Sequence, residues 1–225
     1  AVIVWVYVVQ NVETPRYTLL DKDGAIELRD YPPLVVAQVI REGARERAVN
    51  RGFSPLAGYI FARERSGPSI AMTAPVTQQR VTQQRVTPAA PSGQVQAPAV
   101  APTPAQPAPQ TPPVPAASSP PGSAASAWQI RFIMPSRYTK ADLPTPADGS
   151  GVTLHSLPAQ RRAAIRFSGV ATDAAIAKQE AALRAWLEAR KLQVAGPAIY
   201  AYYNDPFTPG FLRRNEVIIT IAPGP

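Results

Sequence analysis

The stretch from Ile26 to Gly43 occurs twice in this chain, and this repeat constrains the fold more than any other feature. Each copy alternates apolar and polar residues, passes a proline, alternates again and ends at a glycine, which is typical of two half-buried strands joined by a turn. A helical pattern and two apolar, β-prone runs follow each copy. The sequence therefore predicts a hairpin-helix-strand-strand unit, used twice and packed face to face in one α+β domain. The matched residues, all at one constant offset, are Ile26 and Val152, Leu28 and Leu154, Pro32 and Pro158, Ala37 and Ala163, Val39 and Ile165, and Gly43 and Gly169.

The strands of the first half can be bounded from alternation and turn residues. Tyr17 to Leu20 and Ala25 to Arg29 predict a hairpin, because Asp21 to Gly24 ends in an Asp-Gly pair that suits a left-handed turn position. Leu34 to Ile40 is the returning strand. Ile70 to Thr77 is predicted as the strand that follows the first helix.

The first helix is predicted over Arg45 to Phe61, where apolar residues recur at helical spacing. Pro55 lies inside this pattern, and a proline there deletes a backbone donor and clashes with the preceding turn. We therefore expect either a kink or a restart of the helix with Ser54 as its cap. The apolar positions that share one face are Val49, Phe53, Leu56 and Ile60.

The second half repeats these elements with clearer boundaries. Either Thr172 or Asp173 caps a helix that runs to about Leu192, with arginine or lysine in its last turn. Ile199 to Tyr203 and Val217 to Ile221 are predicted as the closing strands. Two sets of side chains are expected to face inward: Trp128, Ile130, Phe132 and Met134 from a strand, and Ile176, Leu183, Trp186 and Leu187 from the helix.

Residues 78–127 differ in composition from the rest of the chain. A Val-Thr-Gln-Gln-Arg motif at 76–80 is repeated at 81–85, and the stretch from 86 to 127 then has no charge and is rich in Pro, Ala, Ser and Gln. Such a segment cannot bury enough apolar surface to offset its ordering entropy. We predict a disordered insertion within a domain that spans residues 12–225. It is either passive or a docking segment for a polyproline-binding partner.

Residues 1–11 form a separate apolar segment, which the sequence leaves open to several interpretations. Ala1 to Val9 is wholly apolar or aromatic, but a spanning helix needs about 20 such residues. The segment is interpreted as the remnant of a signal or membrane anchor, or as an added strand. The predicted location is accordingly periplasmic or membrane-anchored, with a cytoplasmic location as the alternative.

Composition excludes several classes of site. The chain has no cysteine, which excludes disulfides, thiolate nucleophiles and thiolate metal sites. Its net charge of +8 is carried mostly by scattered arginines, which fits a solvated surface, an anionic ligand or an acidic lipid surface. Nucleic acid is not expected as a partner, because no run combines dense positive charge with interleaved aromatic residues.

Several motifs together resemble the SOUL haem-binding protein family. The resemblance implies a twisted antiparallel, barrel-like sheet with two helices packed outside it, a fold similar to the effector-binding domains of certain bacterial transcription regulators. It also implies binding of haem or other tetrapyrroles and no settled catalytic activity. The residues that carry it are Val12-Glu13-Thr14, Arg29-Asp30-Tyr31-Pro32-Pro33, Gly52-Phe53, Leu56-Ala57-Gly58-Tyr59-Ile60, Ile70-Ala71-Met72-Thr73-Ala74-Pro75-Val76-Thr77, Phe132-Ile133-Met134-Pro135-Ser136, Phe167-Ser168-Gly169 and Arg213-Arg214-Asn215-Glu216-Val217.

The resemblance also implies a ligand site between the first helix and the loop before the last strand. A tetrapyrrole is a flat apolar disc with two carboxylates at one edge, so it needs an apolar cleft with cations at the rim. Some relatives have lysines where this chain has Gly58 and Pro209. The helix residues of this site can equally well be core residues that face the sheet. The implied positions are Phe53, Leu56, Ala57, Ile60, Phe207, Phe211 and Leu212, with Arg51 and Arg213 for the propionates.

Iron ligation through a side chain is not favoured by the strand pattern. His155, the only histidine, alternates with the inward-facing Leu154 and should therefore face outward. Arg29, at the same position in the first copy, is also predicted to face outward. We therefore interpret His155 as a surface residue. The other possible iron ligands are interpreted as packing residues: Tyr59, Tyr200, Tyr202, Tyr203, Met72 and Met134.

The sequence does not favour an enzyme. It offers no Ser-His-Asp or Cys-His set, no glycine-rich phosphate loop and no spaced metal ligands. Glu216, flanked by Arg213 and Arg214, is interpreted as part of a structural salt bridge rather than as a catalytic acid.

The predicted function is therefore non-catalytic binding of haem or another tetrapyrrole, for buffering, transport or delivery. Two alternatives remain open. One is an accessory or scaffold protein, tethered to a membrane or membrane-protein complex through residues 1–11. The other is a module that binds small-molecule effectors.

Overall fold

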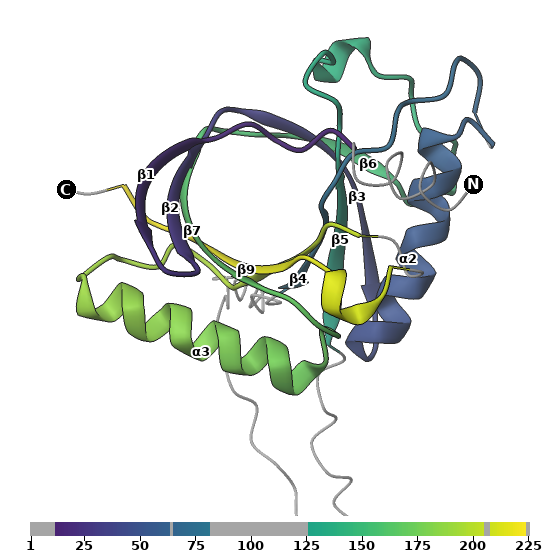
Figure 1. Cartoon of the computed structure of the whole chain (residues 1–225). Helices are drawn as coiled ribbons and strands as arrows, with labels where there is room; N and C mark the ends of the chain where they lie inside the picture. Colours follow the sequence, from purple (N-terminus) through teal and green to yellow (C-terminus); the bar gives the residue numbers. More distant parts are fainter. Residues whose placement is uncertain (1–11, 64, 82–125, 205–207, 224–225) are drawn as a thin grey trace, which may run out of the picture. The chain divides into compact units, whose positions relative to one another are not determined.

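A single antiparallel sheet of nine strands organises the part of the chain that the structure describes (Figure 1). The structure is a computed structural model, and it describes residues 12–63, 65–81, 126–204 and 208–223. These residues belong to one of the two compact units into which the chain divides; the other, Gln83–Ala124, lies outside the described residues. The strands are β1 (Thr18–Asp23), β2 (Ile26–Tyr31), β3 (Leu34–Glu42), β4 (Val76–Val81), β5 (Ala127–Ile133), β6 (Thr153–Leu157), β7 (Gln160–Phe167), β8 (Ile199–Tyr202) and β9 (Asn215–Thr220).

The element order confirms the repeated unit. Strands β2 and β3, helix α2 (Arg45–Ile60) and strands β4 and β5 are followed by β6 and β7, helix α3 (Asp173–Ala189) and strands β8 and β9. The order in the sheet is β1-β2-β7-β9-β8-β4-β5-β3-β6. Apart from β1, this order is symmetric. Reversing it and replacing each strand by the equivalent strand of the other repeat (β2 by β6, β3 by β7, β4 by β8, β5 by β9) gives the same order. The two halves are therefore related by an approximate two-fold axis between β4 and β8.

The predicted pairing within each repeat is wrong. The two strands of each copy do not form a hairpin with each other; instead β2 pairs with β7 and β3 pairs with β6. Because the two copies have the same apolar pattern, a strand can pair equally well with the second strand of its own copy or with that of the other copy. The halves therefore exchange strands. The hairpin that does form is β1 with β2, at a turn where Gly24 has a φ of 57°.

This exchange forces the sheet to curl. Pro32 and Pro33 alone join β2, second in the sheet order, to β3, which is eighth. Six strand spacings would cover about 29 Å in a flat sheet, whereas this short connection can span only about 11 Å. Pro158 and Ala159 make a similar link from β6 to β7. The strands curve accordingly in Figure 1. The sheet is nevertheless open, and the implied closed barrel is corrected to a curled sheet, since β1 and β6 remain unpaired edges.

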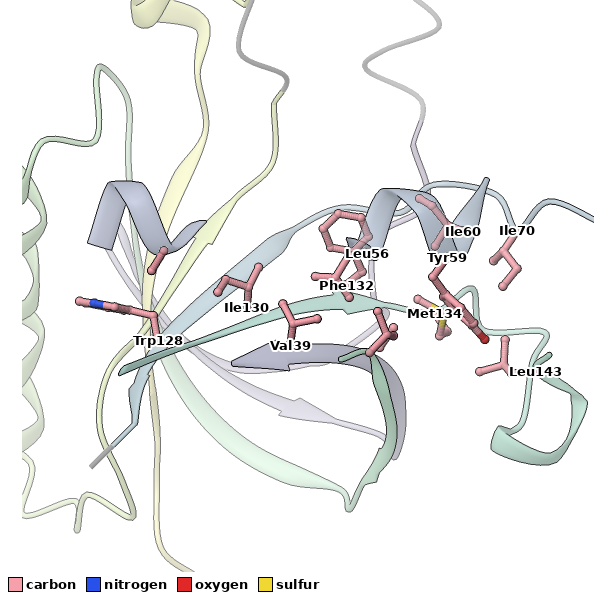
Figure 2. Close-up of a cluster of buried hydrophobic side chains, with 13 residues drawn as sticks. Val39, Leu56, Tyr59, Ile60, Ile70, Trp128, Ile130, Phe132, Met134 and Leu143 are labelled. Carbon is pink, nitrogen blue, oxygen red and sulfur yellow. The ribbon is translucent and has the colours of Figure 1, made fainter. Parts of the chain in front are cut away.

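Helix α2 covers one end of the sheet and builds the first hydrophobic core (Figure 2). Leu56 and Ile60 pack against Val39 and Ile130, and all four are at most 1% exposed. Gly52 allows this close approach, because a Cβ there would meet Ile130 Cδ1 at 2.9 Å. Pro55 lies within an uninterrupted helix, so the predicted restart capped by Ser54 is wrong.

Helix α3 covers the other half in the same way. Thr172 caps it as predicted, its hydroxyl accepting a hydrogen bond from the Ala175 N–H at 3.2 Å. Its inward residues Ile176, Leu183 and Leu187 are buried against β7 and β9. Both helices therefore lie on the same side of the sheet, outside its curve (Figure 1).

Two strand boundaries in the first half differ from the prediction. The strand expected over 70–77 begins at Val76 and runs through Val81, four residues into the segment predicted as an insertion. It extends that far because β5 and β8 pair with it on both sides. Residues 82–125 and the N-terminal residues 1–11 lie outside the described residues.

Candidate functional site

The predicted tetrapyrrole residues on α2 divide into buried and exposed positions. Leu56, Ala57 and Ile60 are buried, with Leu56 and Ile60 in the first core. Phe53 is 39% exposed, and the edge of its ring packs on Phe132 with centroids 5.3 Å apart. Arg51 is exposed and donates a hydrogen bond to the carbonyl of Glu42 at the end of β3. At this helix, therefore, Phe53 and Arg51 are accessible to a ligand.

The predicted loop residues lie in the short 3-10 helix η2 (Gly210–Leu212) and beside it. Phe211 is 78% exposed, which is unusual for a phenylalanine, and Leu212 is 53% exposed. The Arg213 guanidinium donates to the carbonyl of Thr208 at 2.7 Å. Phe207 lies outside the described residues.

Hydrogen bonds connect η2 with the beginning of α2. Arg45, the first residue of α2, donates to the carbonyl of Ala171 at 3.3 Å. The Gly169 N–H donates to the carbonyl of Gly210 at 3.0 Å. The short turn from Gly169 to Ala171 is therefore hydrogen-bonded both to Arg45, at the start of α2, and to η2.

A cluster of polar side chains lies on the inner face, the face of the sheet turned away from α2 and α3. At its centre Arg29 forms two hydrogen bonds with Glu216, at 2.7 and 3.0 Å. Both residues are 1% exposed. Arg214 donates to the same carboxylate at 2.7 Å, so the salt bridge predicted for Glu216 is confirmed.

The predicted outward orientation of Arg29 is wrong. Arg29 is expected to point outward because it alternates with Leu28, yet it is among the most buried side chains in the described part of the chain. The curl explains this, because a curled sheet encloses both of its faces and the side turned away from the helices becomes an interior. The available signal was the alternation itself, which places Glu27, Arg29 and Tyr31 together on this face.

Tyrosines complete this network. The Tyr203 hydroxyl donates to Glu216 at 2.7 Å, and the Arg29 guanidinium donates to the Tyr31 hydroxyl at 3.1 Å. The Arg29 guanidinium also lies over the Tyr17 ring at 4.5 Å. Glu27 accepts a hydrogen bond from Arg29 at 2.8 Å. Arg29 is thus held on several sides by charge-assisted bonds and an aromatic face.

The pKa values of the network follow from burial and charge pairing. Burial alone would raise the pKa of Glu216, but Arg29 and Arg214 outweigh it and lower that pKa. Burial would likewise lower the pKa of Arg29, and Glu216 raises it instead. Burial, followed by the charge of Glu216, raises the pKa of Tyr203 well above its ordinary value. Glu216 is therefore a carboxylate and Arg29 a cation at neutral pH, which suits a structural pair better than an acid catalyst.

The other candidate iron ligands are engaged elsewhere. His155 is exposed on the inner face and lies 2.9 Å from the Thr153 hydroxyl. Met134 is buried in the first core, whereas Met72 is 38% exposed outside any strand, so only Met134 packs as predicted. The tyrosine hydroxyls form hydrogen bonds with protein groups: Tyr59 with the Pro144 carbonyl, Tyr200 with Glu180, Tyr202 with Arg45 and Tyr203 with Glu216.

Two further observations limit the kinds of site within the described residues. No three or more His, Cys, Asp or Glu side chains gather there as metal ligands would. Among the helices of this part of the chain, none is both long and apolar enough to span a bilayer.

Known structures share this fold at low sequence identity. The C-terminal domain of EcmrR aligns with a TM-score of 0.52 at 9% identity over 92% of this chain and 99% of that domain. An uncharacterized conserved protein from Listeria innocua aligns with a TM-score of 0.51 at 11% identity, over 88% of this chain and 92% of its own. A hydrolase from the same organism has a TM-score of 0.50 at 12% identity, over 88% and 91%. These similarities establish the fold alone.

At the level of sequence, no curated protein matches the chain significantly. The family described as SOUL heme-binding protein, in contrast, matches residues 12–220. That range includes both repeated units, η2 and all the inner-face residues described above. The chain therefore belongs to the SOUL haem-binding protein family.

Proposed function

We propose that this protein binds haem or another tetrapyrrole reversibly and without catalysis, in buffering, transport or delivery. Membership of the SOUL family supports the ligand class. The observation that carries the proposed site is the exposure of Phe211 and Leu212, 78% and 53%, in a short helix linked through the Gly169 turn to the beginning of α2. Exposed apolar side chains at such a place mark a surface that another molecule covers.

The residues at this surface fit a flat amphipathic ligand. Phe53, Phe211 and Leu212 supply accessible apolar area, and Arg51 and Arg213 are the cations nearest to them in sequence. The only histidine of the chain lies on the inner face, so binding at this surface would not use histidine as an axial ligand. When bound, haem would supply a redox-active iron, and these residues would hold its apolar face and its propionates.

A hemin titration of the purified chain tests this proposal. We expect a Soret band that saturates with hemin. Phe53→Asp and Phe211→Asp should each weaken the affinity by about tenfold or more, since the loss of one buried aromatic contact is worth about 1.5–3 kcal/mol. Leu19→Asp is the matched control, because Leu19 is 49% exposed on the edge strand β1. Equal affinities of the Phe211→Asp and Leu19→Asp variants would refute the site.

The same titration separates the proposal from the two alternatives. A scaffold protein would leave the hemin spectrum unchanged and would instead copurify with a membrane complex. A module for other small effectors would also leave that spectrum unchanged, but its melting temperature would rise with non-porphyrin ligands.

A further inference from the structure

Two inner-face arginines, Arg131 on β5 and Arg162 on β7, form no hydrogen bond or ion pair with the Arg29–Glu216 network, although the Arg162 guanidinium lies over the Tyr31 ring at 5.2 Å. Arg162 is only 7% exposed, and its guanidinium donates to the side-chain oxygen of Gln160 at 2.7 Å. Arg131 is half-buried and donates through Nε to the side-chain oxygen of Gln38 at 2.9 Å. Each is thus fixed by one neutral amide, which orients a guanidinium without neutralising it.

The curl of the sheet brings these two side chains toward each other. Their strands are third and seventh in the sheet order, and both side chains alternate with residues that face the helices. Burial lowers the pKa of Arg131 to about 10, and the charge of Arg162 lowers it further. Burial also lowers the pKa of Arg162.

The charges around these arginines do not balance. In the Arg29–Glu216 network the cations Arg29 and Arg214 are matched by the carboxylates of Glu27 and Glu216. Neither Arg131 nor Arg162 forms an ion pair with any carboxylate of the described residues. Two positive charges on an enclosed face therefore have no counter-charge from this part of the protein.

The unused N–H groups of both arginines point to a place for that counter-charge. Nη1 of Arg162, and both Nη1 and Nη2 of Arg131, make no hydrogen bond within the described residues. Among those residues, Trp128 Nε1 is the only fully buried side-chain nitrogen or oxygen without a partner, so these unused N–H groups are not fully buried. Thr77, across from Arg131 in the strand register, adds a hydroxyl to the same area.

We propose that Arg131 and Arg162 together bind a small oxyanion, a carboxylate or phosphate group, on the inner face of the sheet. Guanidinium groups bind these oxyanions with paired, charge-assisted hydrogen bonds, and Gln38 and Gln160 hold the two guanidiniums in place without neutralising them. This site lies on the opposite face of the sheet from Phe53. It does not depend on the proposed tetrapyrrole site.

Thermal unfolding of the full chain in three salts of matched ionic strength tests this site: sodium phosphate, sodium succinate and sodium chloride. We expect a saturable rise in melting temperature with phosphate or succinate but not with chloride, and the stronger of the two identifies the anion class. Arg131→Gln and Arg162→Gln should each weaken the response at least tenfold. Arg161→Gln is the control, because Arg161 is the exposed neighbour that pairs with Asp30.

Outcomes of the opposite kind would overturn the proposal. Equal rises in all three salts, or an oxyanion response that survives in both glutamine variants, would show that this pair binds no specific anion. A purely structural role predicts that both variants melt lower in chloride, whereas removal of an unneutralised charge should leave the melting temperature there unchanged or higher.

A direct measurement on the wild-type chain covers the case in which the variants fail to fold. The assigned Nε–Hε resonances of Arg131 and Arg162 should shift saturably on titration with phosphate or succinate, and those of Arg161 should not. If neither resonance moves, the site does not exist. Hemin binding should be unaffected by Arg162→Gln, so a failure of one proposal can be distinguished from a failure of the other.

Discussion

Arg29 and Glu216 lie 187 positions apart in the sequence, yet they form a buried two-bond ion pair at 2.7 and 3.0 Å. They lie on β2 and β9, which are separated by β7 in the sheet, so their side chains meet across the inner face. This pair therefore ties the first repeat to the second. Its formation depends on the exchange of strands that curls the sheet.

Replacement of Glu216 by Gln should be strongly destabilising. The substitution removes the charge that faces Arg29 and leaves a buried cation, so we expect the free energy of unfolding to fall by about 3–5 kcal/mol. Asp30→Asn is the control, because Asp30 makes a similar two-bond pair with Arg161, at 2.8 and 2.9 Å, on an exposed surface. That variant should lose only about 0–1 kcal/mol. Urea unfolding measures both, and equal losses would contradict the assigned role of burial.

Stability should depend on pH through Glu216. Its pKa is lowered in the folded state from an unfolded value of 4.5, so the stability it contributes is complete above pH 4.5 and is lost as the pH falls through the folded value. The free energy of unfolding should therefore decrease from about pH 5 to about pH 3 more steeply in the wild type than in Glu216→Gln. Parallel curves in urea unfolding over this range would exclude this explanation. The other carboxylates whose pKa values are lowered, Glu13, Glu27, Asp30 and Asp142, account for the slope that remains in the variant.

Gly52→Ala should destabilise the protein although alanine favours helices. The added Cβ would meet Ile130 Cδ1 at 2.9 Å and Val39 Cγ2 at 3.0 Å, and overpacking of this kind costs about 1–3 kcal/mol. Gly196→Ala, where a Cβ would meet nothing within 4 Å, is the matched control. Adding Ile130→Val should recover part of the loss, because it removes the nearest atom. If Gly52→Ala proves stabilising in thermal unfolding, the close packing of α2 on the sheet is not as described.

Thr172→Ala should weaken α3 at its beginning. The hydroxyl of Thr172 accepts the Ala175 N–H at 3.2 Å, and loss of such a cap costs about 1 kcal/mol. Ser168→Ala, an exposed substitution a few residues earlier, should change the stability by less than about 0.5 kcal/mol. Chemical denaturation of the two variants measures this difference. If the free energy of unfolding of Thr172→Ala equals that of the wild type, solvent replaces the capping hydrogen bond at no cost.

The repeated pattern was sufficient to predict the elements, because apolar alternation and helical spacing are local properties of the sequence. The beginning of α3, its Thr172 cap and the strand face of Trp128, Ile130 and Phe132 all follow from such local signals. The predicted end of α3 at about Leu192, with a basic last turn, is wrong, because the helix ends at Ala189 and its last turn has no basic residue. The pairing of the strands could not be derived in this way. Since both copies present the same pattern, a local signal cannot tell whether β2 pairs with β3 or with β7.

By itself, the sequence determined that this chain has two equivalent halves, which residues form their helices and strands, and the family to which they belong. Tertiary structure alone decided which strands pair and, through the two-residue links at Pro32 and Pro158, that the sheet curls. The curl encloses a second face, so Arg29, Arg162 and Glu216, which alternate with core residues as surface positions do, become interior charges. Alternation specifies only which residues share a face, and burial of that face depends on contacts between distant strands.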